Sequence, residues 1–363
     1  MDDVEHMRAA LALARRGLGS TWPNPSVGCV LVRDGRVVGR GTTAPGGRPH
    51  AERVALDRAG EAARGATAYV TLEPCAHTGQ TPPCAAALIA AGVRRVVVAC
   101  RDPDPRVDGG GIAMLQKAGV EVTEGVLRAE AEALQHGFFT RVRQGRPAVT
   151  LKLASTLDGR IATRSGESQW ITGHHARRAA HALRAEHDAV MVGSGTVQTD
   201  NPELTCRIRG MRRNRDLRIV ADTHLRTRLM SRVIASAAET PTWFLHAAGA
   251  DPARAAAFRE AGARLITVKQ GEPGIDLVAA LAALGAEGLT RLLVEGGAQL
   301  AGALLRAGLV DRLAWFHAPT VMGGDGLPAA ASFGITSLAA MPRFIRTEQR
   351  AVGGDLLTHY VRE

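Results

Sequence analysis

Thr71-Leu-Glu-Pro-Cys75-Ala-His77-Thr-Gly-Gln-Thr-Pro-Pro-Cys84 is the stretch around which the first half of this chain is organised, together with His50-Ala-Glu52 upstream of it. One imidazole and two thiols from separate segments suit a zinc ion that has three protein ligands. A catalytic zinc ion keeps its fourth position open for water. Glu52 is placed beside His50 to move protons between that water and a substrate. The pattern predicts hydrolytic deamination of a nitrogen heterocycle.

The spacing of the two cysteines differs from the usual one. Zinc deaminases that act on nucleobases carry His-x-Glu followed by Pro-Cys-x-x-Cys, whereas eight residues separate Cys75 from Cys84 here. Two other interpretations stay open. In the first, His77 is a fourth ligand and closes a structural zinc site, although such a sealed site has no need of Glu52. In the second, the chain binds no metal.

Two polar residues near the motif are candidates for contacts with the substrate. His77 is better interpreted as a polar neighbour of the substrate than as a ligand. Asn24, in the turn Pro23-Asn24-Pro25, is able to hydrogen-bond a ring carbonyl, although by itself it would be an ordinary turn residue.

The composition indicates a globular protein of two domains. A chain of 363 residues is long for one core, and 45% apolar with 22% charged residues is ordinary for a soluble protein. No apolar run approaches the length that spans a bilayer, and the acidic start, Met1-Asp-Asp-Val-Glu5, does not resemble a signal peptide. Five sparse cysteines argue against a disulfide framework, so we expect a cytoplasmic protein.

The net charge of +10 raises the question of a nucleic-acid partner. The positive charge is almost entirely arginine, because Lys117, Lys152 and Lys269 are the only lysines. The arginines are scattered, and aromatic residues for base stacking make up only 4% of the chain. Small phosphorylated substrates explain the charge with fewer assumptions. We therefore expect neither nucleic acid nor a membrane as a partner.

The first half is predicted to be an α/β layer in which helices flank a sheet. Asp34-Gly35 is a strong hairpin signal between two apolar runs. The predicted strands are 27–32, 37–41, 68–72, 95–99 and 120–123. The predicted helices are 2–18, 50–63, 110–118, 128–143 and one that begins near Cys84.

His50 and Glu52 constrain where their helix begins. Residues two apart on a helix point about 200° apart around the axis. The two side chains are therefore able to share a site only if His50 lies at the mouth of the helix, before the helical turns begin.

The second half begins after a linker, Gln144-Gly-Arg-Pro147, and repeats an α/β pattern. The predicted strands are 148–153, 189–192, 218–221, 243–246, 264–268, 291–295 and 312–316. The predicted helices are 175–184, 252–260, 276–284 and 299–307. The last two runs, 343–350 and 355–361, are predicted to close the sheet as antiparallel edge strands.

Two glycine turns in the second half follow predicted strands. Val192-Gly-Ser-Gly-Thr196 and Val294-Glu-Gly-Gly297 would present backbone N–H groups to a phosphate, or would be simple tight turns. Lys152 is unusual in a chain that prefers arginine, although a surface lysine is the ordinary interpretation. The polar loop 166–172 would form a wall of a cofactor pocket or pack on the sheet.

These motifs together resemble the bifunctional riboflavin-biosynthesis deaminase–reductases over nearly the whole chain. The landmarks are the wide cysteine gap and His50-Ala-Glu52, with Pro23 to Gly28, Ser155 to Gly159, Gly166 to Thr172, Asp200-Asn-Pro202 and Glu295-Gly-Gly297. The resemblance implies a cytidine-deaminase-like three-layer domain over 1–144. It implies a dihydrofolate-reductase-like domain over 145–363.

The resemblance also implies the chemistry. The first domain would hydrolyse an amino group of 2,5-diamino-6-(5-phosphoribosylamino)pyrimidin-4-one, with zinc on His50, Cys75 and Cys84 and Glu52 as proton shuttle. The second would pass hydride from NADPH to the ribosyl group and give the ribityl chain. A nucleic-acid-editing zinc deaminase with an appended nucleotide-binding domain is the alternative. We expect a homo-oligomer, either a dimer or a tetramer.

Further site residues are carried over from the resemblance. The positions that match its NADPH contacts are Ala154, Trp170, Thr196, Asp200, Thr223, Gly297, Ala298, Gln299, Leu300, Ala301, Gly302 and Ala303. The positions that match or extend its substrate contacts are Asn24, His77, Lys152, Ser168, Arg184, Leu204, Arg207 and Glu295. The arginines among them would meet the ribose phosphate.

Three positions depart from the family pattern. Gln80 stands where a basic residue is usual, Thr223 replaces a serine, and Thr320 stands where lysine is common. The first departure would weaken the grip of the deaminase on phosphate unless another arginine supplies it.

Overall fold

The computed structural model describes residues 2–78, 82–211, 216–272 and 274–363. The chain divides into two compact units between Gly145 and Arg146. Each unit contains its own main sheet. Gln80 lies outside the described residues.

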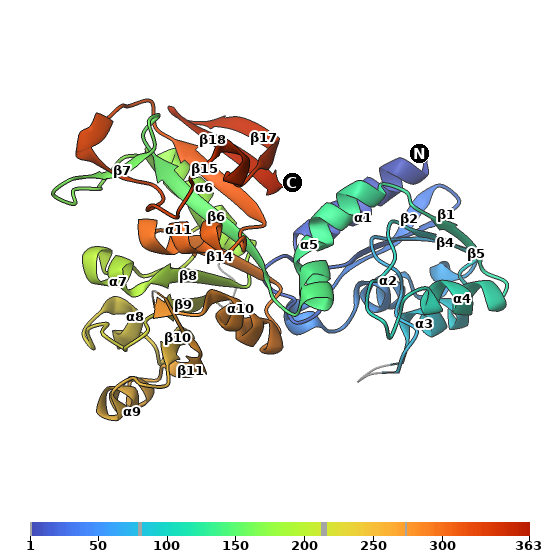
Figure 1. Ribbon diagram of the computed structural model, residues 1–363. Coiled ribbons are helices and arrows are strands. Elements are labelled where there is room, and N and C mark those ends of the chain that lie inside the picture. The colour runs from blue at the N-terminus through green and yellow to red at the C-terminus, as the bar shows by residue number, and fades with distance from the viewer. Residues whose placement is uncertain (1, 79–81, 212–215, 273) are drawn as a thin grey trace. The chain divides into compact units, whose positions relative to one another are not determined.

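The first unit is a five-stranded sheet between two layers of helices (Figure 1). The strand order is β2-β1-β3-β4-β5, where β1 is antiparallel to β2 and β3, and β3, β4 and β5 are parallel. The strands are β1 (Gly28–Arg33), β2 (Arg36–Thr42), β3 (Thr67–Val70), β4 (Arg95–Val98) and β5 (Glu121–Glu124). Helices α1 (Asp3–Arg15) and α5 (Arg128–Gln144) lie on one face; α2 (Ala51–Ala59), α3 (Cys84–Ala90) and α4 (Gly110–Lys117) lie on the other.

Local sequence signals explain most of these bounds. Asp2 caps α1, because its side chain accepts a hydrogen bond from the backbone N–H of Glu5. Asp34 and Gly35 both have positive φ, as the predicted two-residue hairpin requires. The prediction of one helix over 50–63 is wrong at its end. Gly60 has φ 53°, so α2 ends at Ala59 and a short 3-10 turn (Gly60–Ala63) follows.

The helices approach the sheet closely where strands carry glycine. A Cβ atom on Gly28 would lie 1.9 Å from the carbonyl oxygen of Ala10 in α1. A Cβ atom on Gly41 would lie 1.9 Å from the carbonyl oxygen of Ala51 in α2. The Gly41 contact holds α2, and therefore His50 directly before it, close against the sheet.

The second unit is built on a nine-stranded sheet in the order β11-β10-β9-β8-β14-β6-β15-β18-β17 (Figure 1). The seven strands from β11 to β15 are parallel, and β18 is antiparallel to both of its neighbours. The strands are β6 (Ala148–Ser155), β8 (Ala189–Gly193), β9 (Leu217–Ala221), β10 (Thr242–Ala247), β11 (Arg264–Val268), β14 (Arg291–Glu295), β15 (Arg312–His317), β17 (Phe344–Val352) and β18 (Asp355–Arg362). The predicted closing pair of antiparallel strands is confirmed.

The predicted helices of the second unit are confirmed within two residues at each end. They are α6 (His174–Ala185), α9 (Pro252–Glu260), α10 (Leu277–Ala286) and α11 (Ala298–Arg306). The sequence did not predict several short elements: α7 (Ser194–Asp200), α8 (Arg232–Ala235), and the small strands β7 (Arg160–Thr163), β12 (Gln270–Gly271), β13 (Gly274–Ile275) and β16 (Gly326–Pro328). These elements are too short for a hydrophobic periodicity to distinguish them from turns.

Among the described residues, no helix is both long enough and apolar enough to cross a bilayer.

The contact of Gly28 with α1 gives a prediction about stability. In Gly28→Ala the new methyl group meets backbone atoms of α1, which do not move aside as a flexible side chain would. We expect a loss of about 1–3 kcal/mol in the free energy of unfolding. Denaturant unfolding followed by circular dichroism measures it. Gly249→Ala is the control, because its Cβ would have no atom within 4 Å; equal stability of the two variants would refute the close contact.

Candidate functional site

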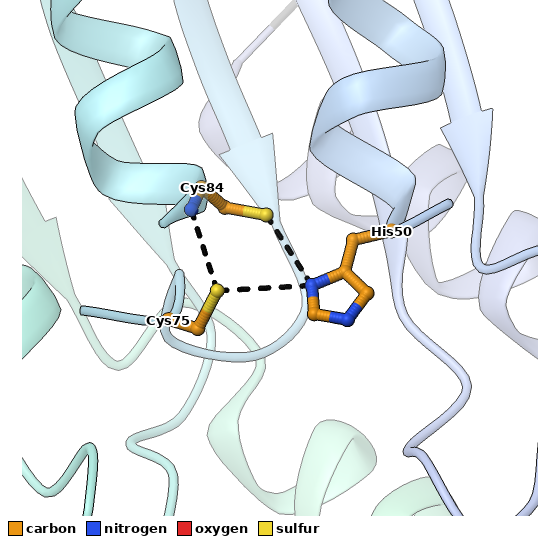
Figure 2. Close-up of side chains that lie close together, drawn as sticks. All are labelled: His50, Cys75 and Cys84. Carbon is orange, nitrogen blue, oxygen red and sulfur yellow. Dashed lines mark hydrogen bonds between the residues drawn. The ribbon is translucent and has the colours of Figure 1, made fainter. Parts of the chain in front are cut away.

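The structure brings together the three side chains that the sequence proposes as zinc ligands. One ligand atom from each of His50, Cys75 and Cys84 lies within 4.8 Å of the others. The Sγ atoms of Cys75 and Cys84 are 3.7 Å and 3.3 Å from Nδ1 of His50, and Figure 2 shows all three converging on one point. A His/Cys/Cys set at this spacing fits zinc with its fourth position open.

Each ligand comes from the end of an element, as its local sequence dictates. His50 is the residue before the first turn of α2, with extended backbone (φ −69°, ψ 159°), so the predicted placement at the helix mouth is confirmed. Cys75 follows β3, and Cys84 is the first residue of α3, directly after Pro83.

The surroundings of Cys75 favour its thiolate, the form that binds zinc. Hydrogen bonding with Cys84, and then with His50, lowers the pKa of the Cys75 thiol to about 4. The same interaction with Cys75 raises the pKa of the Cys84 thiol. The backbone N–H of Cys84 also donates to Cys75 Sγ at 3.3 Å.

Glu52 lies beside this group in the first turn of α2 and is only 3% exposed. Burial raises the pKa of its carboxyl group to about 7, although the neighbouring His50 opposes the shift. A buried carboxyl group that titrates near neutral pH is suited to general acid–base work.

We call His50, Cys75 and Cys84 the metal group, and a cavity of about 330 Å³ adjoins it. His50, Glu52 and Cys75 line it, together with the two predicted substrate contacts Asn24 and His77. The amide of Asn24 donates to the carbonyl oxygen of Gly47 at 2.9 Å, so its position in the wall is fixed. Among the described residues His77 does not join the metal group, so the structure gives no support to a fourth protein ligand.

The sequence missed one whole side of this cavity. Asp102, Asp104, Arg106 and Val107 line it, and all four belong to the loop that follows β4. Burial raises the pKa of the Asp102 carboxyl group to about 7. One sequence signal could have found this wall. Asp102-Pro-Asp104-Pro follows β4, which is parallel to β3. The carboxyl ends of parallel strands meet at the same edge of a sheet, so this segment belongs near Cys75.

A second cavity, of about 780 Å³, lies in the second unit. Ten of the residues that the sequence proposes for the reductase line it: Lys152, Ala154, Ser168, Trp170, Arg184, Thr196, Asp200, Leu204, Arg207 and Glu295. The lining contains five Lys and Arg side chains but only three Asp and Glu side chains. The former are Lys152, Arg177, Arg184, Arg207 and Arg232, and the latter are Asp200, Glu203 and Glu295. This excess of positive charge suits phosphorylated ligands.

A buried ion pair organises the floor of the second cavity. Arg184 Nε and Nη2 donate to the two carboxylate oxygens of Glu295 at 2.6 and 2.9 Å. Burial alone would raise the pKa of Glu295, but the charges of Arg184 and then Lys152 outweigh it and lower that pKa to about 2. Lys152 lies opposite Glu295 in the register of β6 and β14. It is half-buried, and burial lowers its pKa, so the interpretation as a surface lysine is wrong.

The two glycine turns both lead into helices. Gly193 precedes α7, and Gly297 precedes α11. A Cβ atom on Gly297 would lie 3.2 Å from Thr196 Oγ1, so the two turns are neighbours. The first-turn amides of a helix have no acceptor within the helix and suit a phosphate.

The remaining proposed cofactor residues lie outside the lining of the second cavity. Ala298, Gln299 and Leu300 form the first turn of α11, whereas Ala301 is fully buried. A Cβ atom on Gly302 would lie 2.7 Å from the carbonyl oxygen of Ala331, so Gly302 faces the interior. Ala303 follows in the same helix, and Thr223 follows β9.

Comparisons with known proteins cover both units. Residues 1–100 match the family "Cytidine and deoxycytidylate deaminase zinc-binding region", and residues 147–358 match the family "RibD C-terminal domain". The riboflavin biosynthesis protein RibD of Escherichia coli is 44% identical, over 99% of this chain and 100% of that protein.

This chain belongs to the RibD family.

Solved structures agree with that assignment over the full length. A RibD structure from Acinetobacter baumannii has a TM-score of 0.88 at 36% identity and covers 99% of both chains. A diaminohydroxyphosphoribosylaminopyrimidine deaminase/5-amino-6-(5-phosphoribosylamino)uracil reductase from Thermotoga maritima has a TM-score of 0.86 at 33% identity and covers 99% of this chain and 98% of that one. The chain is therefore a bifunctional deaminase–reductase of riboflavin biosynthesis that uses zinc and NADPH. A nucleic-acid-editing deaminase is not favoured.

The position of Glu52 predicts a selective loss in this RibD family member. Glu52→Gln keeps the shape of the side chain and leaves all three metal ligands in place, but it removes the group that accepts a proton. We expect full zinc content and a fall in ammonia release of about 10²–10⁴-fold, measured on the purified protein. The control is Glu61→Gln, which changes an exposed glutamate just after the same helix. Normal ammonia release from Glu52→Gln would exclude Glu52 from the mechanism.

The Arg184–Glu295 pair predicts a loss confined to the other unit. Glu295→Gln removes the charge that balances Arg184 and Lys152, so we expect the rate of NADPH oxidation to fall at least about tenfold while ammonia release is spared. Glu287→Gln is the matched control because it breaks only the exposed ion pair with Arg264. An equal loss of both activities in Glu295→Gln would contradict two separate sites.

Proposed function

We propose that residues 1–144 carry the deaminase and residues 145–363 carry the reductase. In this proposal the first unit hydrolyses 2,5-diamino-6-(5-phosphoribosylamino)pyrimidin-4-one, and the second reduces the ribosyl group of the product to ribityl. The observation that supports this proposal most is that each of the two units contains one family match and one cavity, and the residues proposed for its reaction line that cavity.

The deaminase step is assigned to residues of the first cavity. Zinc held by His50, Cys75 and Cys84 would act as a Lewis acid toward water. A carboxylate oxygen of Glu52 would accept a proton from the attacking water and give it to the amino group, which would leave as ammonia. Asn24 and His77 hold the ring, and the buried wall excludes bulk water.

The reductase step is assigned to the second cavity. NADPH would supply the hydride, and backbone N–H groups of the adjoining turns before α7 and α11 would hold its phosphates. Nε and Nη2 of Arg184 both donate hydrogen bonds to the carboxylate of Glu295, and Nη1 donates to the carbonyl oxygen of Thr205. Arg184 therefore fixes Glu295, and the half-exposed Arg207 is the arginine that meets the substrate phosphate.

Location and assembly are part of the same proposal. All five cysteines are free, and two belong to the metal group, which favours the reducing cytoplasm. Large apolar side chains are exposed on the second unit at Val321, Leu338 and Ile345. Such exposure supports a homo-oligomer, a dimer or a tetramer, formed by this chain.

One experiment tests both halves of the proposal. The purified chain is analysed for zinc and then incubated with the diaminopyrimidinone, first without and then with NADPH. We expect one zinc ion per chain, ammonia release in both cases, and loss of nicotinamide absorbance only after deamination. Ammonia release from cytidine in RNA, with the riboflavin precursor untouched, would favour the editing alternative. Removal of zinc by a chelator should stop ammonia release while leaving reduction of supplied 5-amino-6-(5-phosphoribosylamino)uracil intact.

A further inference from the structure

Glu73, the glutamate of Thr71-Leu-Glu-Pro-Cys75, carries no part of the proposed chemistry, yet it is only 3% exposed. The hydrogen bonds that the structure shows for its carboxylate all come from backbone N–H groups. Asp102 and Gly109 donate to Oε2 at 3.3 and 3.1 Å. Gly111 and Ile112 donate to Oε1 at 3.0 and 3.2 Å.

These four donors bracket one segment of the chain. Residues 99–109 connect β4 to α4, and we call residues 101–109 of this connection the β4–α4 loop. Asp102 and Gly109 stand near its two ends, and both donate to the same carboxylate oxygen. Glu73 therefore closes the loop at its base. The other oxygen binds the first turn of α4, where backbone N–H groups lack helical acceptors and the helix dipole favours a negative charge.

The fixed loop forms the wall of the first cavity that the sequence missed. Asp102, held at its N–H by Glu73, accepts through Oδ1 from the N–H of Asp104 at 2.9 Å. Asp104 in turn accepts from the N–H of Arg106 at 3.0 Å. Asp102, Asp104 and Arg106 all line the cavity. A chain of hydrogen bonds thus runs from Glu73 to side chains that line the cavity.

A second contact supports the same junction independently. A Cβ atom on Gly111 would lie 1.9 Å from the carbonyl oxygen of Pro74, the residue between Glu73 and the ligand Cys75. The backbone of α4 therefore packs directly on the segment that delivers the ligand. The backbone N–H of Glu73 also donates to the carbonyl oxygen of Cys100 at 3.0 Å.

We propose that Glu73 is a positioning residue of the deaminase: its carboxylate fixes the β4–α4 loop, and the loop sets the affinity for the substrate. This inference rests on the proposed function of the first unit. The metal group uses His50, Cys75 and Cys84 and includes no residue of the loop, so binding of zinc and positioning of substrate are separable. A carboxylate is required because it only accepts hydrogen bonds, whereas an amide turns donor hydrogens toward two of the four N–H groups.

Glu73→Gln in the full-length chain tests the proposal. We expect the KM for the diaminopyrimidinone to rise at least about tenfold, because several hydrogen bonds to a charged acceptor are lost. Zinc content should stay at the wild-type level, and kcat per zinc should stay within about threefold. Amide hydrogen exchange at Asp102, Gly109, Gly111 and Ile112 should be slow in wild type and faster in the variant. The matched control is Glu124→Gln, which breaks only the ion pair with Arg101 at the edge of the same loop.

The outcomes separate a positioning role from a structural one. A lower kcat in proportion to lost zinc, with KM unchanged, would overturn the proposal, as would a variant indistinguishable from wild type. If Glu73→Gln does not fold, Glu73→Asp takes its place, because its side chain keeps the charge but is too short to reach all four donors. An unchanged KM in Glu73→Asp would also overturn the proposal, as would failure of both variants to fold. A wild-type chain that releases no ammonia from the diaminopyrimidinone would refute the proposed function instead.

Discussion

A zinc ion held by three side chains requires their ligand atoms within a few ångströms of one another, and the rest of the first unit depends on that constraint. The imidazole and the two thiols come from the start of α2, the exit of β3 and the start of α3. No single one of these elements is able to create the site. The close contact that Gly41 permits between β2 and α2 fixes the first of these ends, so backbone packing in the core helps to set the geometry of the site.

The second cavity relies on a different balance. Lys152 and Glu295 lie opposite one another on the parallel strands β6 and β14, and Arg184 joins them from α6. Burying three charges together is costly unless they are paired. The bidentate Arg184–Glu295 contact meets that cost and leaves the remaining basic groups for phosphorylated ligands. Electrostatic pairing therefore holds the side chains of this site together, as metal ligation would in the first unit.

The sequence predicted features that are encoded locally. Ligand types, the turn Asp34-Gly35, the proline before α3 and the helix mouth at His50 each depend on a few adjacent residues. It did not predict the β4–α4 loop as a wall of the cavity, because the role of Asp102 depends on the pairing of β3 with β4. It took the glycine run after β8 for a turn, whereas tertiary packing stabilises the short helix α7. The buried partners of Glu73 likewise emerge only from the fold.

Each unit has a hydrophobic cluster of its own among the described residues: one spans positions 7–139 and the other 176–357. Neither of these two clusters shares a residue with the other, so each is packed from the side chains of its own unit. Under the proposed division of the two reactions, a substitution that disables one cavity would leave the other step running. Such partial failure would appear in a cell as accumulation of a specific intermediate rather than as loss of the protein.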